Sequence, residues 1–393
     1  MTRSAERLAS ISSRIGRSVV LLLATACASD ESTVPGVALV SEIRIDGRAS
    51  DFVPIRWLGV APDGRIAITQ PQDHSVRFFD PNGQPLATVG RRGQGPGEFE
   101  SIVAAGWIGD TLWVAEGARY SLVSPRHVVA RTMRPPPASV APADRERLPR
   151  LSEAYTFTLR SDGSRVVSAT VYPPYPSGWG MGSVPIVAVA PDGAVGILLT
   201  TVNALAGSVE ARNTRGPPDW ARIPFHPPLV HAVAPDGDRL ALVSTSLEGP
   251  EAGTFRVTVH RITGDTAFSR TYPFTGAPIP RHVADSAMNA VLGRSPPHVV
   301  AALRDVRLPS VYPPIESVVL GRDGTTWVEL RETAAGRPWL ILDGRGEPIA
   351  TTVAPPRVTI RAADSTHVWA LERDDDDVES VIRYRIDRGV GGE

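Results

Sequence analysis

One local pattern recurs along this chain: an apolar run that alternates with polar residues, a tight turn containing Asp and Gly, and a second apolar run. Residues 58–68 show it with Asp63-Gly64 as the turn, and Asp323-Gly324 marks another copy. Asp-Gly between alternating runs is the strongest short-range signal for a β-hairpin, because Gly supplies the positive φ that the turn requires. The chain is therefore predicted to be all-β. The other turns of this kind lie at residues 109–110, 162–163, 192–193, 236–237, 264–265 and 343–344.

Each hairpin is followed by a second one, and two hairpins form a four-stranded antiparallel sheet of the size of one propeller blade. This count gives six units, of which the last has only three strands. We expect residues 37–45 to supply its fourth strand, since this closes the ring and leaves no open sheet edge. Trp113, Trp327 and Trp369 occupy equivalent second strands and are expected in the core between blades. The predicted fold is a six-bladed β-propeller closed by an N-terminal strand.

A glycine-rich segment follows the first unit. Residues 89–99 read Val-Gly-Arg-Arg-Gly-Gln-Gly-Pro-Gly-Glu-Phe. This segment resembles the link between repeats in six-bladed NHL-repeat-like and TolB-like propellers, including exported bacterial lipoproteins. The blade pattern extends the resemblance over nearly the whole chain after residue 36, while the glycine-rich motif occurs once. The resemblance implies a fold and a cell-envelope setting, and it implies no single activity.

The N-terminal segment has the pattern of an export signal. Four Arg residues lie within the first 17 residues, before an apolar run at residues 19–24 that is too short to span a bilayer. Cys27, the only Cys of the chain, follows Ala-Thr-Ala in the position of a lipobox cysteine. Lipid modification would explain both its position and its solitude. Ala28 rather than Asp after the cysteine favours the outer membrane, and plain secretion after signal-peptidase cleavage is the alternative.

These features divide the chain into four predicted parts: a signal peptide at 1–26, a lipid-anchored tether at 27–36, the propeller at 37–388 and a tail at 389–393. A long insertion at about 275–314 joins the fourth and fifth blades. Within it, residues 283–292 have helical spacing and end at Gly293, and residues 298–308 are expected to form a second short helix.

The meander geometry places the short turns on one face of the ring. The opposite face, here called the loop face, carries the links between second and third strands and between blades. Loops gathered on one face of a rigid scaffold usually carry the binding. The long segments that fall on the loop face are residues 90–100, 134–150, 172–182, 275–314 and 374–377.

The innermost strands start at the loop face, so charged residues near their starts are expected to ring the mouth of the central channel. Mixed charge there suits a small polar or anionic ligand, because Arg grips carboxylates and phosphates in two-point fashion. Aromatic residues at 172–182 offer stacking surfaces for a sugar or a peptide. Hydrated channel charges without a ligand, and rings packed onto the third blade, are the structural alternatives. The candidate ligand-binding residues are Arg56, Glu153, Tyr172, Tyr175, Trp179, Glu316 and Arg357, with Glu100 and His231 also near the mouth.

Composition and motifs argue against several functions. The formal net charge of -1 gives no electrostatic basis for nucleic-acid binding. The chain has no Lys, which excludes Schiff-base and P-loop lysines, and it has no Gly-x-Ser-x-Gly elbow. The eight His lack the spacing of a zinc site. A calcium-dependent lactonase, similar to six-bladed gluconolactonases, needs several carboxylates converging on the channel. Glu316 and Glu153 are available for this, whereas Arg56 and Arg357 would oppose a cation.

The predicted function is that of a non-enzymatic cell-envelope binding module that acts through its loop face, with no catalytic residues, no metal and no cofactor. The alternative is a channel-centred hydrolase or lyase resembling metal-dependent lactonases. Three or more converging carboxylates favour the enzyme, and neutralisation of Arg by Glu favours the binder. We expect a monomer that binds an unidentified protein or a small polar ligand, reaches the membrane through its lipid anchor alone, and binds no nucleic acid. As a lipoprotein it would face the periplasm or the cell surface.

Overall fold

The computed structural model describes residues 34–214, 216–247 and 252–389. They form six four-stranded antiparallel sheets and one further two-stranded hairpin. The predicted signal peptide and the lipidation site Cys27 lie outside the described residues, as does most of the predicted tail. Neither of the two α-helices in the described ranges is long and apolar enough to cross a membrane.

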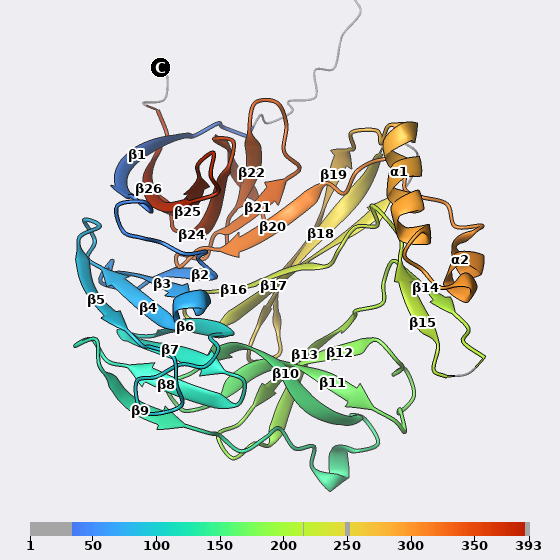
Figure 1. Ribbon diagram of the computed structural model, residues 1–393, viewed down its shortest axis with the longest axis horizontal. Helices are drawn as coiled ribbons and strands as arrows, with labels where there is room; N and C mark the ends of the chain where they lie inside the picture. Colours follow the sequence, from blue (N-terminus) through green and yellow to red (C-terminus); the bar gives the residue numbers. More distant parts are fainter. Residues whose placement is uncertain (1–33, 215, 248–251, 390–393) are drawn as a thin grey trace, which may run out of the picture. The chain divides into compact units, whose positions relative to one another are not determined.

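The first three blades follow one another in chain order (Figure 1). Blade 1 consists of β2 (Trp57–Val60), β3 (Ile66–Gln70), β4 (Ser75–Phe79) and β5 (Pro85–Val89). Blade 2 consists of β6 (Ala104–Ile108), β7 (Thr111–Glu116), β8 (Arg119–Val123) and β9 (Val129–Met133). Blade 3 consists of β10 (Arg150–Leu159), β11 (Arg165–Tyr172), β12 (Ser183–Val189) and β13 (Val195–Asn203). Short 3₁₀ turns lie at Pro71–Asp73 and Pro142–Asp144.

The other three blades complete the ring. Blade 4 consists of β16 (Val230–Val233), β17 (Arg239–Leu247), β18 (Ala252–Arg261) and β19 (Thr266–Thr275). Blade 5 consists of β20 (Ile315–Leu320), β21 (Thr326–Leu330), β22 (Arg337–Leu342) and β23 (Pro348–Ala354). Blade 6 consists of β24 (Val358–Ala363), β25 (His367–Arg373), β26 (Glu379–Asp387) and, from the other end of the chain, β1 (Ala38–Ile45). The prediction of six blades closed by an N-terminal strand is confirmed.

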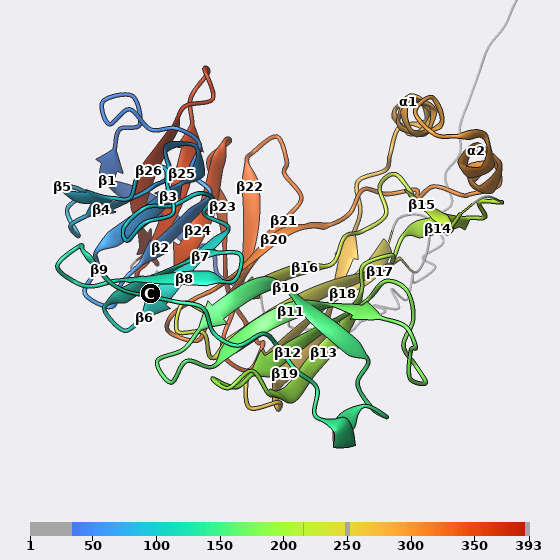
Figure 2. The same ribbon diagram turned by 60° about the horizontal axis from the view of Figure 1, so that its bottom comes forward.

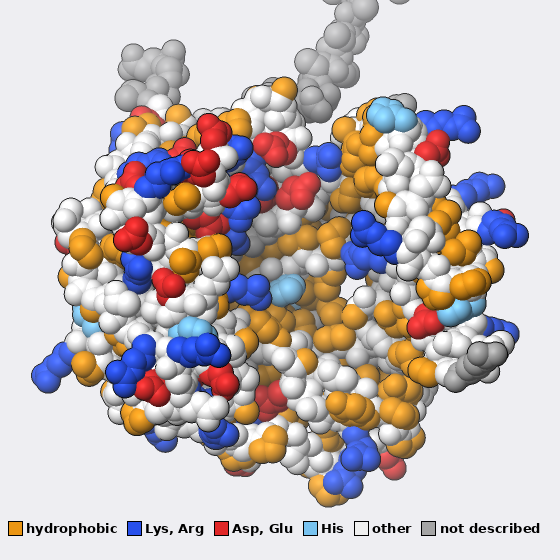
Figure 3. All heavy atoms as spheres, viewed as in Figure 1, with side chains coloured by type: hydrophobic (Ala, Val, Ile, Leu, Met, Phe, Trp, Pro, Cys, Tyr) orange, Lys and Arg blue, Asp and Glu red, His pale blue; other side chains and the backbone are white. Residues whose placement is uncertain are grey.

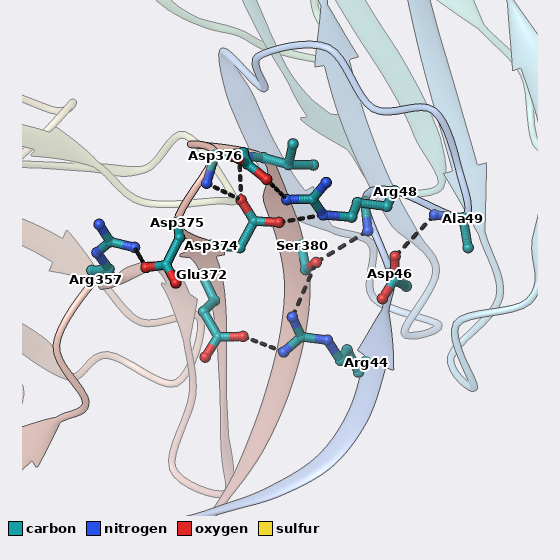
Figure 4. A network of polar contacts seen from close by, with 12 residues as sticks. Arg44, Asp46, Arg48, Ala49, Arg357, Glu372, Asp374, Asp375, Asp376 and Ser380 are labelled. Atoms are coloured by element: carbon teal, nitrogen blue, oxygen red, sulfur yellow. Dashed lines mark hydrogen bonds and ion pairs between the residues drawn. The ribbon is translucent and has the colours of Figure 1, made fainter.

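Closure of blade 6 rests on pairing of β1 with β26 and on side chains next to it (Figure 4). Arg44 pairs with Glu372 and donates to the Ser380 hydroxyl. Arg48 pairs with Asp374 at 2.7 Å and also with Asp376. The ion pairs are exposed, so each contributes little to stability by itself. Their geometric effect is to join the N-terminal segment to the hairpin between β25 and β26.

The turn chemistry explains the hairpins. Gly64 has φ +86° and Gly324 has φ +97°, a region that is open to glycine and strained for other residues. In both turns the preceding Asp accepts a backbone N–H two residues further on, which closes the turn locally. The sequence misplaces one such residue. In the hairpin between β22 and β23 the positive φ belongs to Gly346 rather than to Gly344.

The hydrophobic core consists of successive clusters, and each neighbouring pair of blades shares one of them. Trp113 is 1% exposed between blades 2 and 3, and Trp327 is 1% exposed between blades 5 and 6. Trp369 is 8% exposed between blades 6 and 1. The predicted core role of these three residues is confirmed. Face-to-face packing of sheets around a ring leaves the innermost strands free to surround a central space.

The insertion between blades 4 and 5 contains α1 (Arg281–Leu292) and α2 (Pro297–Leu303). Helix α1 matches the predicted segment 283–292 closely, whereas α2 ends before the predicted end at residue 308. The link between blades 3 and 4 contains a hairpin of β14 (Ser208–Ala211) and β15 (Asp219–Arg222), which was not predicted from the sequence. Figures 1 and 2 show these four elements side by side. Val299 and Leu303 of α2 pack on Ala211 and Ala221 of the hairpin. Two distant links thus form one small packed unit.

Candidate functional site: the central cavity

A cavity of about 400 Å³ lies among the innermost strands of all six blades. This volume is within the range of small-molecule pockets. Figure 3 shows a hollow with mainly hydrophobic walls and with basic and histidine side chains beside it. The strands that contribute are β2, β6, β10, β16, β20 and β24, and the lining includes Arg56, Trp57, Trp107, Trp113, Tyr155, Phe157, His231, Ser317, Arg322, Thr359, Arg361, Asp364 and Trp369.

Three arginines line the cavity: Arg56, Arg322 and Arg361. Arg322 donates to backbone carbonyls, whereas Arg56 and Arg361 have no carboxylate partner among the described residues. The ion pairs of the described chain involve neither side chain, and neither makes a hydrogen bond there. Both residues are exposed. A guanidinium carries five N–H donors in a planar fork that matches carboxylate and phosphate oxygens. The cavity therefore presents two uncommitted anion-binding groups.

The charges behind Arg361 do not neutralise it. Glu379 is 5% exposed and accepts two hydrogen bonds from Arg373, and Glu329 is 1% exposed and pairs with Arg337 at 2.7 Å. Three arginines thus interact with two glutamates, which leaves one positive charge in excess. Desolvation by the surrounding protein lowers the pKa of Arg361, opposed chiefly by the charge of Glu379. An anion bound in the cavity would offset the cost of desolvating the Arg361 charge.

A β-bulge places Arg361 on the cavity wall. In β24 the pairing register moves from Ile360 opposite Ala370 to Ala362 opposite Trp369, so Arg361 has no partner residue on β25. Bulges of this kind re-aim a side chain and occur next to binding sites. Strand β10 has an equivalent shift at Phe157.

Blades 3 and 4 contribute an aromatic wall. The rings of Tyr155 and Phe157 lie 5.3 Å apart, and the rings of Phe157 and His231 lie 5.2 Å apart, both with edge-to-face geometry. Desolvation lowers the pKa of His231, so its ring is neutral near pH 7. Burial raises the pKa of Tyr155, while the nearby charge of Arg56 opposes that shift. The wall therefore combines apolar ring surface with neutral hydrogen-bonding groups.

Four of the predicted channel-mouth residues lie outside the cavity lining: Glu100, Glu153, Glu316 and Arg357. Glu153 accepts hydrogen bonds from Arg165 and from the backbone N–H of Ala138, so it holds the link into blade 3. Glu316 is 3.6 Å from Arg331. Arg357 precedes β24 with φ +64° and donates to Asp375 at 2.7 Å.

The sequence led us to expect Arg357 at the channel, but in the structure Arg361 is the arginine of this segment that lines the cavity. The positive φ of Arg357 turns its side chain toward the hairpin between β25 and β26, and the bulge brings Arg361 to the cavity. Arg56 and His231 line the cavity as expected. Glu100 lies elsewhere and accepts from the side chain of Gln94 at 2.9 Å.

The aromatic residues of the loop after β11 do not form a stacked cluster. Tyr172 is 48% exposed, and Trp179 donates its indole N–H to the carbonyl of Arg147 at 3.1 Å. No ring contact joins these two residues or Tyr175 to one another within the described chain. All three lie outside the cavity lining and remain a prediction for binding on the loop face.

The described residues include no group of three or more His, Cys, Asp or Glu side chains suited to hold a metal ion. Asp364 is the acidic residue of the cavity lining, and its side chain accepts N–H groups of Thr366 and His367. Aspartates of the hairpin tip at 374–377 form ion pairs with Arg48 and Arg357.

No protein-family model matches the chain, and no curated protein matches it in sequence. Among solved structures, a member of the DUF4221 family from Bacteroides vulgatus is similar with a TM-score of 0.50 at 12% identity, covering 90% of this chain and 98% of that one. Regucalcin from Agrobacterium tumefaciens, a calcium-binding protein, gives 0.39 at 12% identity over 88% and 95%. Virginiamycin B lyase from Staphylococcus aureus gives 0.39 at 10% identity over 89% and 98%. The first match supports the fold, and at such identities similarity carries no function. The chain is a six-bladed β-propeller.

Proposed function

We propose that this protein is a non-enzymatic binding protein that holds a small anionic ligand in its central cavity. The observation that carries the proposal is the pair Arg56 and Arg361, which face the cavity without acidic partners. Charge-assisted hydrogen bonds from Arg to carboxylate or phosphate are among the strong polar interactions. The aromatic walls favour a ligand whose remaining part is apolar and planar.

The wider setting is also a proposal. Export and attachment through a lipid on Cys27 would place the cavity in the cell envelope, with the loop face available to a protein partner. The alternative of a channel-centred hydrolase or lyase gains one observation, the neutral ring of His231, which is suited to accept a proton. Binding without turnover is favoured because no hydroxyl or carboxylate of the described lining forms a hydrogen bond with His231.

Matched ligand pairs test the proposal. Benzoate and benzamide differ mainly in charge, as do phenylacetate and phenylacetamide. We expect calorimetry to detect the anions and not the amides, because only the anions satisfy the two guanidinium groups. Equal binding of both members of each pair, or binding that depends on added Ca²⁺, would contradict the proposal. Loss of the ligand during incubation, followed by chromatography, would support the enzyme instead.

The pH dependence of binding gives an independent check. The pKa of His231 is below its ordinary value, so the ring is neutral in the empty cavity near pH 7. A bound anion favours the protonated ring and raises that pKa. Affinity should therefore rise as the pH falls through this range, by at most about tenfold per pH unit, since one proton is taken up.

Calorimetry with a benzenesulfonate ligand measures this effect, because a sulfonate keeps its own charge throughout the range. His231→Gln is the control and should give a flat profile at acidic pH. A wild-type affinity that falls on acidification, or a profile that the substitution leaves unchanged, would show that His231 does not face the bound anion.

A further inference from the structure

A second cavity of about 570 Å³ lies on the side of the short turns. Its lining comes from the turns of blades 1 to 5 and includes Pro62, Gly109, Leu159, Arg160 and Asp236. Three residues line both cavities: Trp107 of blade 2, Pro235 of blade 4 and Arg322 of blade 5. The two spaces are therefore consecutive along the channel, and these three side chains separate them.

Arg322 connects two blades that are not neighbours in the ring. It follows β20 in blade 5, yet its Nη1 donates to the carbonyl of Ala61 at 2.9 Å and its Nη2 donates to the carbonyl of Val60, both in blade 1. Blade 6 lies between these two blades in the ring, packed against both. The side chain therefore passes the end of blade 6 on the channel side and joins blade 5 to blade 1.

The backbone that carries Arg322 is held from both sides. Its N–H donates to the carbonyl of Ala363 in blade 6 at 3.3 Å, and Arg239 of blade 4 donates to the carbonyl of Gly321 at 2.9 Å. Close packing fixes the turn further, since a Cβ on Gly321 would come within 2.2 Å of the Thr325 hydroxyl. Because both its backbone and its guanidinium group are held by hydrogen bonds, the Arg322 side chain has a fixed position between the two cavities.

The terminal nitrogens of Arg322 are hydrogen-bonded, unlike those of Arg56 and Arg361. Desolvation lowers the pKa of Arg322, and the charges of Asp364, Asp236 and Asp63 oppose this shift. Both terminal nitrogens already donate to backbone carbonyls. The neutral carbonyls do not cancel the charge of Arg322, but they fix the position of its side chain, so that its bulk lies between the two cavities.

We infer that Arg322 is the floor of the ligand-binding cavity and limits the length of the ligand, an inference that rests on the proposed anion-binding function. The ligand is then a short anion that enters and leaves through the loop face. Removing the side chain joins the two cavities and admits a longer apolar tail past Trp107 and Pro235.

A homologous series of straight-chain carboxylates, from butanoate to decanoate, tests the inference by calorimetry on the full chain. For the wild type we expect affinity to rise with the first methylenes and then fall. For Arg322→Ala the rise should continue through the longer acids, by about fourfold per methylene that leaves water. Arg322→Met keeps a long side chain without the charge and should retain the wild-type limit.

The outcomes separate the two proposals. If the wild type binds short acids and Arg322→Ala has the same length profile, the floor assignment is wrong and the binding function stands. If the wild type binds the aromatic anions but none of the straight-chain acids, the floor assignment is wrong and the binding function stands. If it binds neither kind of anion while the fold is intact, both proposals fail. Should Arg322→Ala show no cooperative thermal transition, Arg322→Ser, which retains a polar group at the turn, carries the same comparison.

Discussion

Replacing Glu153 with Ala is expected to lower the free energy of unfolding by about 3–5 kcal/mol, because it leaves a buried arginine without its carboxylate. The Arg165 side chain is 0% exposed, and its Nε donates to Glu153 at 3.0 Å. Its Nη2 donates to Glu153 and also to the carbonyl of Pro136. Glu153 in turn accepts the backbone N–H of Ala138 at 2.7 Å. The substitution thus affects blade 3 and the link that precedes it.

Urea denaturation of matched variants measures this effect. The double variant Glu153→Leu/Arg165→Met removes both charges and should lose less stability than Glu153→Ala alone, since apolar residues of similar volume often replace a buried ion pair at little cost. A loss below about 1 kcal/mol for Glu153→Ala would show that water reaches Arg165 and replaces the carboxylate. Reduced ligand affinity with unchanged stability would instead restore Glu153 to the binding site.

The sequence predicted those parts of the fold that local chemistry determines. Asp-Gly turns are recognisable because few residues tolerate the positive φ at Gly64 and Gly324. The closing strand β1 was predicted from the missing fourth strand of the last unit. Helix α1 was predicted because apolar residues recur at helical spacing before Gly293. The turn and helix signals are each contained in a few consecutive residues, whereas the closing strand followed from the strand count.

Features that depend on register or on distant segments could not be predicted in this way. Arg361 reaches the cavity through a bulge, which a pattern of strict alternation does not reveal. Arg322 is identified only when Val60 and Ala61, more than 250 residues away, are known to lie opposite it. The hairpin of β14 and β15 has short strands and is stabilised by packing on α2 rather than by its own sequence.

The same reasoning explains the predicted site residues that lie outside the cavity. Glu153 and Arg357 are near the starts of innermost strands, as the topology requires, yet proximity in sequence does not decide which way a side chain turns. Arg165 is on the strand paired with Glu153, and Asp375 is on the hairpin beside Arg357. Acidic and basic neighbours of this kind become partners in the fold, and sequence position alone does not reveal the pairing.

The double variant Arg56→Ala/Arg361→Ala is expected to weaken binding of a small aromatic carboxylate by about 100-fold or more, because each charge-assisted hydrogen bond contributes roughly 1.5–3 kcal/mol. Stability should change little, since both side chains are exposed to the cavity and have no partner among the described residues. Removing Arg361 ends its repulsion with Arg373 and Arg337 and also its attraction to Glu379 and Glu329, so these charge effects oppose one another. Calorimetry gives the affinities, and thermal unfolding monitors the fold.

Arg357→Ala is the matched comparison, since Arg357 lies four residues before Arg361 and pairs with the exposed Asp375. We expect it to bind as the wild type does. Arg361→Lys should recover only part of the affinity, because an ammonium keeps the charge without the two-point fork. If Arg357→Ala weakens binding while the double variant binds normally, the ligand site is at the loop-face rim beside the 374–377 hairpin and not in the central cavity. If the two arginines act together on one anionic group, the loss in the double variant will differ from the sum of the single losses, whereas two separate anionic groups will give additive losses.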